Sequence, residues 1–394
     1  MSYALLSLPF LAVAVAAAIL LPRRGPAAER RRHWIAVAAA LLVLLVLTAV
    51  FDSAMIGLGL FSYEESLIAG ARIGLAPVED FAYPLALGLG LPALWLALTR
   101  SGGVSAGRLL RQAFVASRPV SWVNTAFPFA AAMLMTTREI DWLLIIGTLY
   151  YLVPYNLAMY GINDVFDYES DAKNPRKGGI EGALLAPELH RPLLRLVLAC
   201  NLPFLVVLLF AGGPAAWVCI ALSSFAVIAY SVPGLRFKER PVLDSITSSF
   251  HFTSPALVAL ALAGAEPGGG IAAVLIAFFV WGMAAHMFGA VQDIGPDREA
   301  GIGSIATAFG ARRTVILALA LWLAAGLLML ATPWPGPLAA VIALPYLLNC
   351  APWVRVTDDT AAATNRAWRR FIALNYLSGF LATLILILLW RLTA

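Results

Sequence analysis

Residues 142–171 read WLLIIGTLYYLVPYNLAMYGINDVFDYESD, an apolar run that ends in a cluster of acids. An apolar run of about 20 residues predicts a helix that spans a membrane. Further runs of this kind lie near 4–21, 34–51, 81–98, 120–137, 193–211, 214–230, 243–264, 271–290, 314–331, 337–354 and 371–390. Since helices bond their own backbone groups within lipid, the sequence predicts an all-α integral membrane protein of about twelve helices.

The composition excludes a soluble protein of the same length. Hydrophobic residues make up 61% of the 394 residues and charged residues only 12%, and the mean hydropathy is +0.85. A water-soluble surface needs more polar cover than this, and a disordered chain needs more charge. The cysteines Cys200, Cys219 and Cys350 stand in separate apolar runs, which predicts neither a disulfide framework nor a cysteine-based metal site.

The positive residues follow the alternation of the loops. Every Lys and Arg except Arg72, Arg138 and Arg391 falls in every second loop, which predicts that these loops are cytoplasmic. The first run lacks a basic segment before it, so it reads as a helix with its N-terminus outside and not as a cleaved signal peptide. The net charge of +5 is therefore a consequence of topology in the cell membrane, and no nucleic-acid partner is expected.

The segment 99–119 is basic and long for a connection between helices. It predicts a boundary between a three-helix module (1–100) and a nine-helix module (118–394), joined by a basic linker (101–117).

The acids at the end of the quoted stretch have a helical spacing. If the helix continues, Asp164, Asp167 and Asp171 form one stripe, with Asn163 beside it. Stacked carboxylates near lipid repel one another and require a cation. Mg²⁺ suits such oxygen ligands, and it fills its remaining positions with water and substrate phosphate.

A second acidic pair, Asp293 and Asp297, is expected on the same membrane face. Cations that could hold a diphosphate lie on the same side, and they are Lys173, Arg176, Lys177, Arg236, Lys238 and Arg298. The alternative is that all of these are ordinary solvated charges at helix ends.

Four motifs together resemble the UbiA-type intramembrane prenyltransferases over roughly 115–392. They are R-P-x-S-W-x-N (118–124), N-D-x-x-D-x-x-x-D (163–171), Y-S-x-P-x-L-R-x-K (230–238) and D-x-x-x-D followed by R-E-A-G (293–301). The resemblance implies a nine-helix bundle around a lateral, lipid-open cavity. It also implies that Asp164, Asp167, Asp171, Asp293 and Asp297 hold two Mg²⁺ ions with an isoprenyl diphosphate. Many members carry a further acid upstream of the last motif, where this chain has Gln292 or Gly289.

Four other residues near these motifs are considered as well, and two of them have alternative roles. Arg118 is expected at the diphosphate. Tyr230 faces an allylic cation or belongs to the interfacial aromatic belt, and Asn124 lines the cavity or bonds another helix. His286 is expected to be a packing or hydrogen-bonding residue. The glycine-containing loop 162–192 is a candidate lid.

The segment 52–80 of the three-helix module is acidic, and Pro77-Val-Glu79-Asp80-Phe81 opens its last helix. Acids in a first turn commonly complement the helix dipole. The arrangement also resembles the small subunits of heterodimeric lycopene cyclases. That resemblance implies that Glu79 or Asp80 protonates a carotenoid end group, and that a second small cyclase subunit is required.

The two modules together favour the carotenoid branch of the family, since Asn174–Gly182 looks like its lycopene elongases. The resemblance then implies transfer of C5 units from dimethylallyl diphosphate to lycopene, giving C45 and C50 carotenoids, with ring closure as a possible outcome. The alternatives are an aromatic (quinone-precursor) prenyltransferase with an unrelated N-terminal anchor, and a secondary transporter. The predicted topology places Glu79 and Asp80 on the side opposite the aspartate motifs, so the three-helix module could also be a docking piece.

Overall fold

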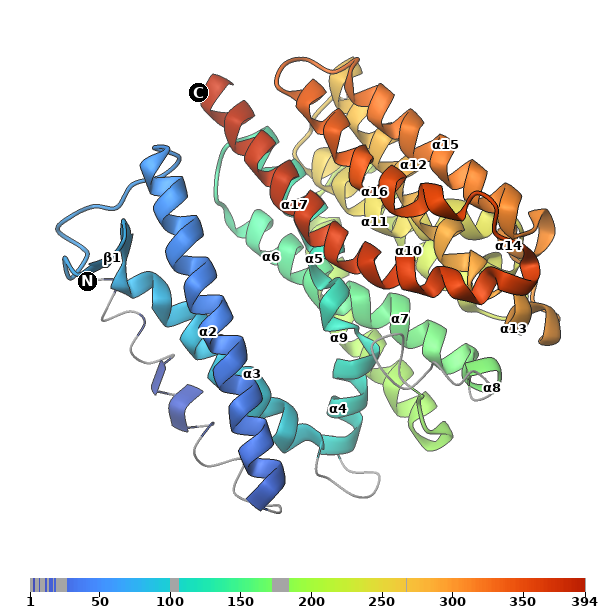
Figure 1. The fold of residues 1–394 in the computed structure, drawn as a ribbon, viewed down its shortest axis with the longest axis horizontal. Coiled ribbons are helices and arrows are strands. Elements are labelled where there is room, and N and C mark those ends of the chain that lie inside the picture. The colour runs from blue at the N-terminus through green and yellow to red at the C-terminus, as the bar shows by residue number, and fades with distance from the viewer. Residues whose placement is uncertain are drawn as a thin grey trace. The chain divides into compact units, whose positions relative to one another are not determined.

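The structure is a computed structural model that describes residues 27–99, 106–171, 184–266 and 268–393, with a few positions between 3 and 18. It divides into two compact units, unit 1 (Met1–Arg111) and unit 2 (Gln112–Ala394). The division falls within helix α4 (Ala106–Ala116), in the segment expected to be a linker. Strands within the described ranges are limited to one two-residue pair, and the prediction of an all-α membrane protein is confirmed (Figure 1).

Unit 1 is built on two helices joined by a small hairpin. Its described elements are α2 (Ala27–Gly57), β1 (Arg72–Ile73), β2 (Ala76–Pro77), the 3₁₀-helix η2 (Val78–Phe81) and α3 (Ala82–Thr99). The antiparallel hairpin is fastened to α2, because the N–H of Leu75 donates to Ser53 Oγ at 3.0 Å. Gly74 is required there, since it has φ 65° and a Cβ would lie 2.5 Å from Ser53 Oγ. The first predicted helix (4–21) lies largely outside the described residues.

Unit 2 contains nine long helical segments among its described residues. They are α5 (Trp122–Thr137), α6 (Trp142–Leu152) with α7 (Pro154–Phe166), α9 (His190–Ala211), α10 (Pro214–Ser231), α11 (Leu243–Leu262), α12 (Gly269–Val291), α15 (Ala311–Met329), η6 (Gly336–Ile342) with α16 (Ala343–Cys350) and η7 (Ala351–Trp353), and α17 (Asn365–Thr393). Shorter elements at their ends are η3 (Pro119–Ser121), α8 (Tyr168–Asp171), η4 (Pro187–Leu189), η5 (Phe237–Glu239), α13 (Ile294–Glu299), α14 (Ile305–Phe309) and η8 (Asp358–Thr364). All eleven predicted runs outside 4–21 are therefore helical.

The run 142–161 is two helices and not the single helix expected, because Pro154 has no N–H to continue α6. Polar side chains bond carbonyls on both sides of this break. Thr125 donates to the carbonyl of Tyr151 at 2.7 Å, and the Asn156 amide donates to the same carbonyl at 2.8 Å. From α9, the Asn201 amide donates to the carbonyl of Pro154 at 2.8 Å. A broken helix is tolerated in lipid when other groups satisfy its backbone in this way.

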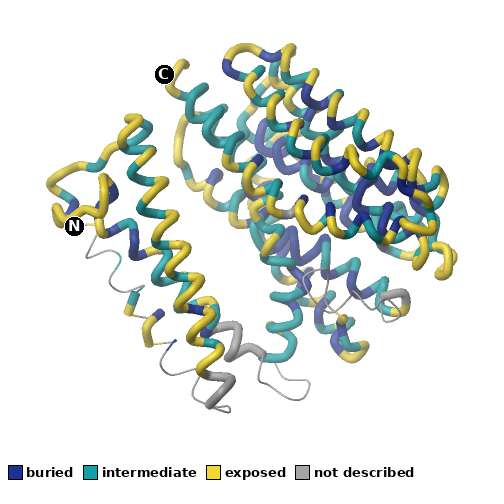
Figure 2. Tube along the Cα trace, viewed as in Figure 1, coloured by how far each residue is buried: buried dark blue, intermediate teal, exposed yellow. Residues whose placement is uncertain are grey.

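Aromatic packing fills the interior of unit 2 on the side of α12 and α15. Trp322 of α15 is fully buried, and its ring packs on those of Phe288, Tyr346 and Phe371. Large apolar side chains are exposed on the outward faces, such as Phe210 (88% exposed) and Leu348 (74%). Figure 2 shows exposed positions along these helices in yellow. An apolar surface of this extent suits contact with lipid.

Candidate active site

Arg118 and Asp164 form a buried ion pair at one end of unit 2. Arg118 Nη2 donates to Asp164 Oδ1 at 3.1 Å, and the Asp164 side chain is fully buried. The guanidinium also lies over the Tyr160 ring, 4.3 Å from its centroid. Arg118 has φ 49°, a left-handed conformation that costs a non-glycine residue about 1–2 kcal/mol. Strain of this kind commonly accompanies functional sites, where the surroundings hold one side chain in place.

Lys238 forms a second ion pair beside the first. Its ammonium contacts Asp167 and lies 3.4 Å from Asn163 Oδ1, which also accepts a hydrogen bond from Ser231 at 2.9 Å. Asn163 therefore aligns Lys238 with the carboxylate of Asp167. Four residues of the two motifs at 163–171 and 230–238 meet here, although the motifs lie about 70 positions apart in the chain.

The second acidic segment comes to the same end of unit 2. Asp297 lies near enough to Lys238 to act on its charge, as Asp164 does. Burial lowers the pKa of Lys238 to about 8, and the negative charges of Glu239, Asp164 and Asp297 oppose this shift. Asp293 precedes α13 and is half-buried, as is Asp297, whose Oδ2 accepts from Ser304 at 3.4 Å.

The donor set fits a hard divalent cation. Within the described ranges, no three His, Cys, Asp or Glu side chains close into a metal cage. Mg²⁺ does not require one, since it is usually held by one or two carboxylates together with substrate phosphates. Asp164 beside Arg118 and Asp167 beside Lys238, with Asp297 of the second segment near Lys238, suit that mode of binding. The residues present therefore fit Mg²⁺ bound with a diphosphate.

The acids at 164–171 do not lie on one continuous helix. Helix α7 ends at Phe166, Asp167 follows with φ −101° and ψ 0°, and α8 begins at Tyr168. The expected stripe is thus interrupted at Asp167, which turns to Lys238. Repulsion between stacked carboxylates favours such a break. The Asp171 side chain lies outside the described residues, as do Lys173, Arg176, Lys177 and much of the expected lid loop.

The remaining predicted cations have local partners. Arg236 pairs with Glu239, and its Nη2 donates to the carbonyl of Phe166 at 3.3 Å, next to Asp167. Arg298 instead pairs with Asp358 at 2.7 Å and is half exposed. Its guanidinium also donates to the carbonyl of Thr307 at 3.3 Å. Arg298 thus links α13 to its neighbours, and these contacts do not include the aspartates of the two motifs.

Gly289 and Gln292 are the positions where the family resemblance implies a further acidic residue, and both are held by local contacts. The Gln292 amide donates to the carbonyl of Gly289, and its oxygen accepts from Asn365 of α17 at 2.5 Å. A Cβ on Gly289 would lie 2.9 Å from the ring of Trp368. An acidic side chain has no room at 289, and a Glu at 292 could still accept the bond from Asn365 but could not donate one to the carbonyl of Gly289.

Three further residues of unit 2 were candidates from the sequence: Tyr230, Asn124 and His286. The Tyr230 ring packs edge-on against that of His251, with centroids 5.2 Å apart. Asn124 is half-buried and makes no side-chain hydrogen bond with the residues described. His286 Nε2 lies 3.6 Å from Asp244 Oδ2, which accepts from the N–H of Ile305 at 2.7 Å. Asp244 is a fully buried acid that the motif search missed, because its role in holding the start of α14 depends on a contact 61 positions away.

Unit 1 contains its own group of acids. Glu79 is 7% exposed, and its Oε1 accepts from the N–H of Ala69 at 2.5 Å, while its buried Oε2 has no partner among the described residues. Asp80 Oδ2 accepts from the Tyr63 hydroxyl at 2.7 Å. Burial raises the pKa of Asp80; the hydrogen bond from Tyr63 lowers it, and the charge of Glu79 raises it further. Sequence reasoning missed Tyr63, which precedes Asp80 by 17 positions.

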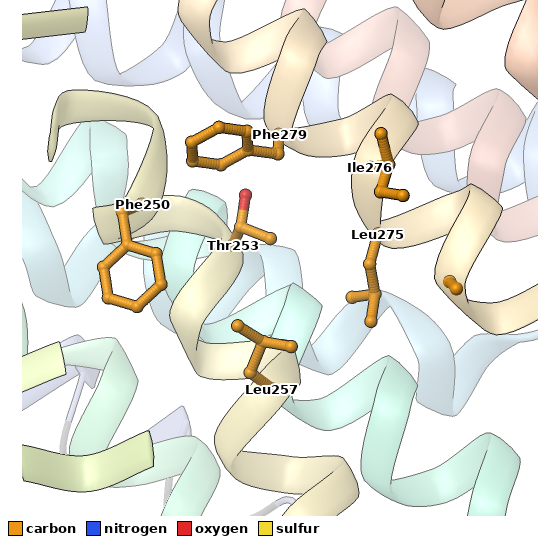
Figure 3. Close-up of a pocket in the computed structure, with 7 residues that line it drawn as sticks. Phe250, Thr253, Leu257, Leu275, Ile276 and Phe279 are labelled. Atoms are coloured by element: carbon orange, nitrogen blue, oxygen red, sulfur yellow. The ribbon is translucent and has the colours of Figure 1, made fainter. Parts of the chain in front are cut away.

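An apolar groove of about 400 Å³ lies between α11 and α12, away from the acidic end (Figure 3). It is lined by Phe250, Thr253, Leu257, Ala272, Leu275, Ile276 and Phe279. Its single hydroxyl, on Thr253, donates to the carbonyl of Ser249 at 3.2 Å. The groove therefore suits a hydrocarbon chain and carries no reactive group.

Comparisons with known proteins agree with this geometry. The sequence model of the UbiA prenyltransferase family matches residues 125–388. The chain is 49% identical to the "C(50) beta-cyclic carotenoids biosynthesis protein LbtBC" of Dietzia sp. (strain CQ4), over 98% of this chain and 97% of that protein. It is 48% identical to a "Lycopene elongase/hydratase" of Corynebacterium glutamicum, over 71% of this chain and 97% of that protein.

Solved structures share the fold. A UbiA homolog from Archaeoglobus fulgidus bound to DMAPP and Mg²⁺ superimposes with a TM-score of 0.52 at 19% identity, covering 68% of this chain and 99% of that one. The same homolog bound to GPP and Mg²⁺ gives a TM-score of 0.51. The resemblance of residues 115–392 is confirmed. The chain therefore belongs to the UbiA prenyltransferase family and is a membrane-embedded prenyltransferase.

Proposed function

We propose that unit 2 is a Mg²⁺-dependent lycopene elongase, which transfers C5 units from dimethylallyl diphosphate to lycopene in the synthesis of C50 carotenoids. Relatives that are 48% and 49% identical bear the names of a lycopene elongase/hydratase and a C50 carotenoid biosynthesis protein. The observation that carries the proposal is the meeting of two acidic segments around Lys238 at one end of an apolar helical unit. A diphosphate is held there while its isoprenyl chain extends among apolar side chains.

In this proposal, Asp164, Asp167, Asp171, Asp293 and Asp297 hold two Mg²⁺ ions. When bound, these ions neutralise charge on the leaving diphosphate. Arg118 and Lys238 contact the diphosphate oxygens, with Arg236, Arg298, Lys173, Arg176 and Lys177 as further candidates. Arg118 is positioned in advance by Asp164 and Tyr160, and Lys238 by Asn163, so little reorganisation is needed as charge develops.

The interior of unit 2 then handles the carbon chemistry. The C1–O bond of the donor breaks, and its electrons leave with the diphosphate. Apolar surroundings keep water from the allylic cation, which the Tyr230 ring faces and Asn124 flanks. The terminal double bond of lycopene attacks C1 and leaves a tertiary carbocation. That cation loses a proton, takes up water or closes to a ring. One addition gives a C45 product and two give a C50 product.

We also propose that the acidic end of unit 2 faces the cytoplasm, with the N-terminus of the chain outside. The positive-inside bias of the loops supports this orientation. Arg138, one of three basic residues outside the bias, lies with its guanidinium 4.3 Å from the Trp390 ring, next to Arg391. Arg138 and Arg391, two of the three basic residues outside the bias, therefore lie at the same end of unit 2.

A direct assay tests the function. Purified full-length chain in lipid is incubated with lycopene, dimethylallyl diphosphate and Mg²⁺, and the carotenoids are identified by mass. We expect C45 and C50 products, no product after chelation with EDTA, and recovery on adding Mg²⁺. Prenylation of an aromatic acid without C45 or C50 product would reject the assignment in favour of an aromatic prenyltransferase, and transport of a solute would favour the transporter.

For unit 1 we propose a lycopene-cyclase subunit that acts with a second small cyclase subunit. Its acids have few counter-charges, since Arg72, the one cation between 52 and 80, pairs with Glu65. The buried Oε2 of Glu79 has no hydrogen-bond partner within the described residues. Glu79 and Asp80 are the candidate acids that protonate an end-group double bond, and the resulting carbocation closes the ring.

The hydrogen bond from Tyr63 leads to a prediction about pH. Because this bond lowers the pKa of Asp80, Tyr63→Phe is expected to raise that pKa, so Asp80 keeps its proton to higher pH. Cyclisation should fall as pH rises through the pKa of Asp80, and the variant should move this fall to higher pH. The ratio of cyclic to acyclic C50 products, measured across pH in membranes containing both cyclase subunits, checks this. Tyr83→Phe, at an exposed tyrosine of the same unit, is the control. A shift to lower pH would contradict the prediction.

A further inference from the structure

His251 has a nitrogen with no bonding partner in the middle of α11. The residue is 3% exposed, and its Nε2 is buried without a hydrogen-bond partner among the described residues. The backbone carbonyl of Ala226 interacts with the ring, and because Nε2 has no partner we assign this interaction, and the proton, to Nδ1. In a neutral imidazole with a proton on Nδ1, Nε2 carries a free lone pair. An unpartnered ionisable group inside a membrane span calls for a functional explanation.

The position of His251 relates it to the diphosphate end. Its ring contacts that of Tyr230, and the next residue, Ser231, donates a hydrogen bond to Asn163 at 2.9 Å. His251 is therefore one aromatic ring removed from the segment that bonds Asn163, the residue before Asp164. It follows Asp244 by seven residues on α11, which is about 10 Å along a helix axis. For Nε2 to reach them, the reacting carbons of a donor bound at Arg118 would lie between the acidic end of unit 2 and His251.

Other buried atoms without partners in the described part of unit 2 cannot take the same role. The indole nitrogens of Trp281 and Trp322 and Nε of Arg118 are donors, and the hydroxyl of Thr148 and the amide oxygen of Asn156 are very weak bases. The buried acids Asp164 and Asp244 already accept hydrogen bonds from Arg118 and Ile305. Among the buried atoms without partners in the described part of unit 2, Nε2 of His251 is thus the one basic site with a vacant lone pair.

We propose that Nε2 of His251 accepts the proton released after prenyl transfer; this rests on the lycopene elongase function proposed above. When the terminal double bond of lycopene has attacked C1 of the donor, the tertiary carbocation loses a proton from an adjacent carbon. The C–H electrons form the new C=C bond, and the proton goes to Nε2. The imidazolium then passes this proton to the departing diphosphate, which restores the neutral base.

This assignment predicts what happens when the base is absent. Ionisation of the donor and C–C bond formation do not require His251, so diphosphate is still released. The carbocation then persists until water adds to it, giving a tertiary alcohol, or until the prenyl group leaves again as the prenyl alcohol. Removal of the base should lower formation of the olefinic C45 and C50 products by about 10²-fold, the smaller end of what general bases contribute.

Two variants separate a base from a structural residue. His251→Asn keeps a side-chain amide where Nδ1 bonds Ala226 and removes Nε2. His251→Gln places an amide near Nε2 but cannot accept a proton. A purely structural role is satisfied by one of these amides, whereas a base is replaced by neither. Both variants are compared with the full-length wild type in lipid for thermal stability, diphosphate release and the masses of the carotenoid products.

The expected result is normal stability in at least one variant, diphosphate release within a few-fold of wild type, and the loss of olefinic product in both. Olefin formation by His251→Asn or His251→Gln within a few-fold of wild type would overturn the proposal. The loss of diphosphate release together with product would also overturn it, since that places His251 before the C–C bond. A wild-type chain that forms no C45 or C50 product from lycopene would reject the lycopene elongase function itself.

Discussion

Replacement of Asp164 by Asn should reduce prenyl transfer by about 10³-fold, the loss that follows removal of one group stabilising charge in a transition state. Asp164 is fully buried at the diphosphate end and paired with Arg118. Asn has the same shape and can still accept a hydrogen bond, but it has no charge to share with a metal ion. The rate of C45 formation at saturating Mg²⁺, with Asp293→Asn as a second test, measures the effect.

The same substitution leaves Arg118 without its counter-charge, and breaking a buried pair costs about 3–5 kcal/mol. Lower stability alone could then explain lost activity. The double variant Asp164→Asn with Arg118→Met removes both charges and should recover most of the stability, because an apolar residue replaces the guanidinium. It should remain inactive, since neither the carboxylate nor the cation is present.

The exposed acid Glu139 lies at the other end of α5, and Glu139→Gln is the matched control that should leave transfer unchanged. Transfer within ten-fold of wild type by Asp164→Asn would contradict the assignment of Asp164 to the reaction. Recovery of transfer in the double variant would do so as well, because it would mean that only the stability of the pair matters.

Sequence reasoning identified the helices and the acidic ends because both depend on local information. A run of apolar residues is visible without knowing its neighbours, and Asp164 and Asp167 belong to a motif of fixed spacing. The break between α6 and α7 was missed although Pro154 is plain in the sequence. The polar groups that make this break possible, such as Asn201, come from other helices. Hydropathy alone cannot show that a backbone carbonyl has a partner.

Residues whose roles depend on distant partners were not predictable in the same way. Arg298 belongs to the family motif, yet its guanidinium pairs with Asp358, 60 positions later in the chain. Gln292 stands at one of the two positions where the family resemblance implies a further acid, and its partner Asn365 becomes apparent only when α12 and α17 are packed together. In the sequence, His251 is an ordinary polar residue in an apolar run. Only the structure shows that its Nε2 is buried without a hydrogen-bond partner among the described residues.

Deletion of residues 1–105 should separate elongation from cyclisation completely. The remaining chain keeps α4 and all of unit 2, which is a compact unit with its own core. A relative that covers 71% of this chain, a length close to that of unit 2, is named a lycopene elongase/hydratase. The relative that matches 98% of the chain is named for C50 beta-cyclic carotenoids. The longer relative is thus the one whose name mentions cyclic carotenoids.

We therefore expect the truncated chain to form acyclic C45 and C50 carotenoids from lycopene at a rate within a few-fold of the full chain, and to form no cyclic product when the second cyclase subunit is supplied. Glu79→Gln in the full chain is the matched variant. Its amide oxygen can still accept the N–H of Ala69, so unit 1 should stay folded, while the acidic proton is lost. Cyclic product from the truncated chain would show that unit 1 takes no part in ring closure. Loss of elongation on truncation, with elongation retained by Glu79→Gln, would instead assign unit 1 a docking or folding role, because only the deletion removes its surface.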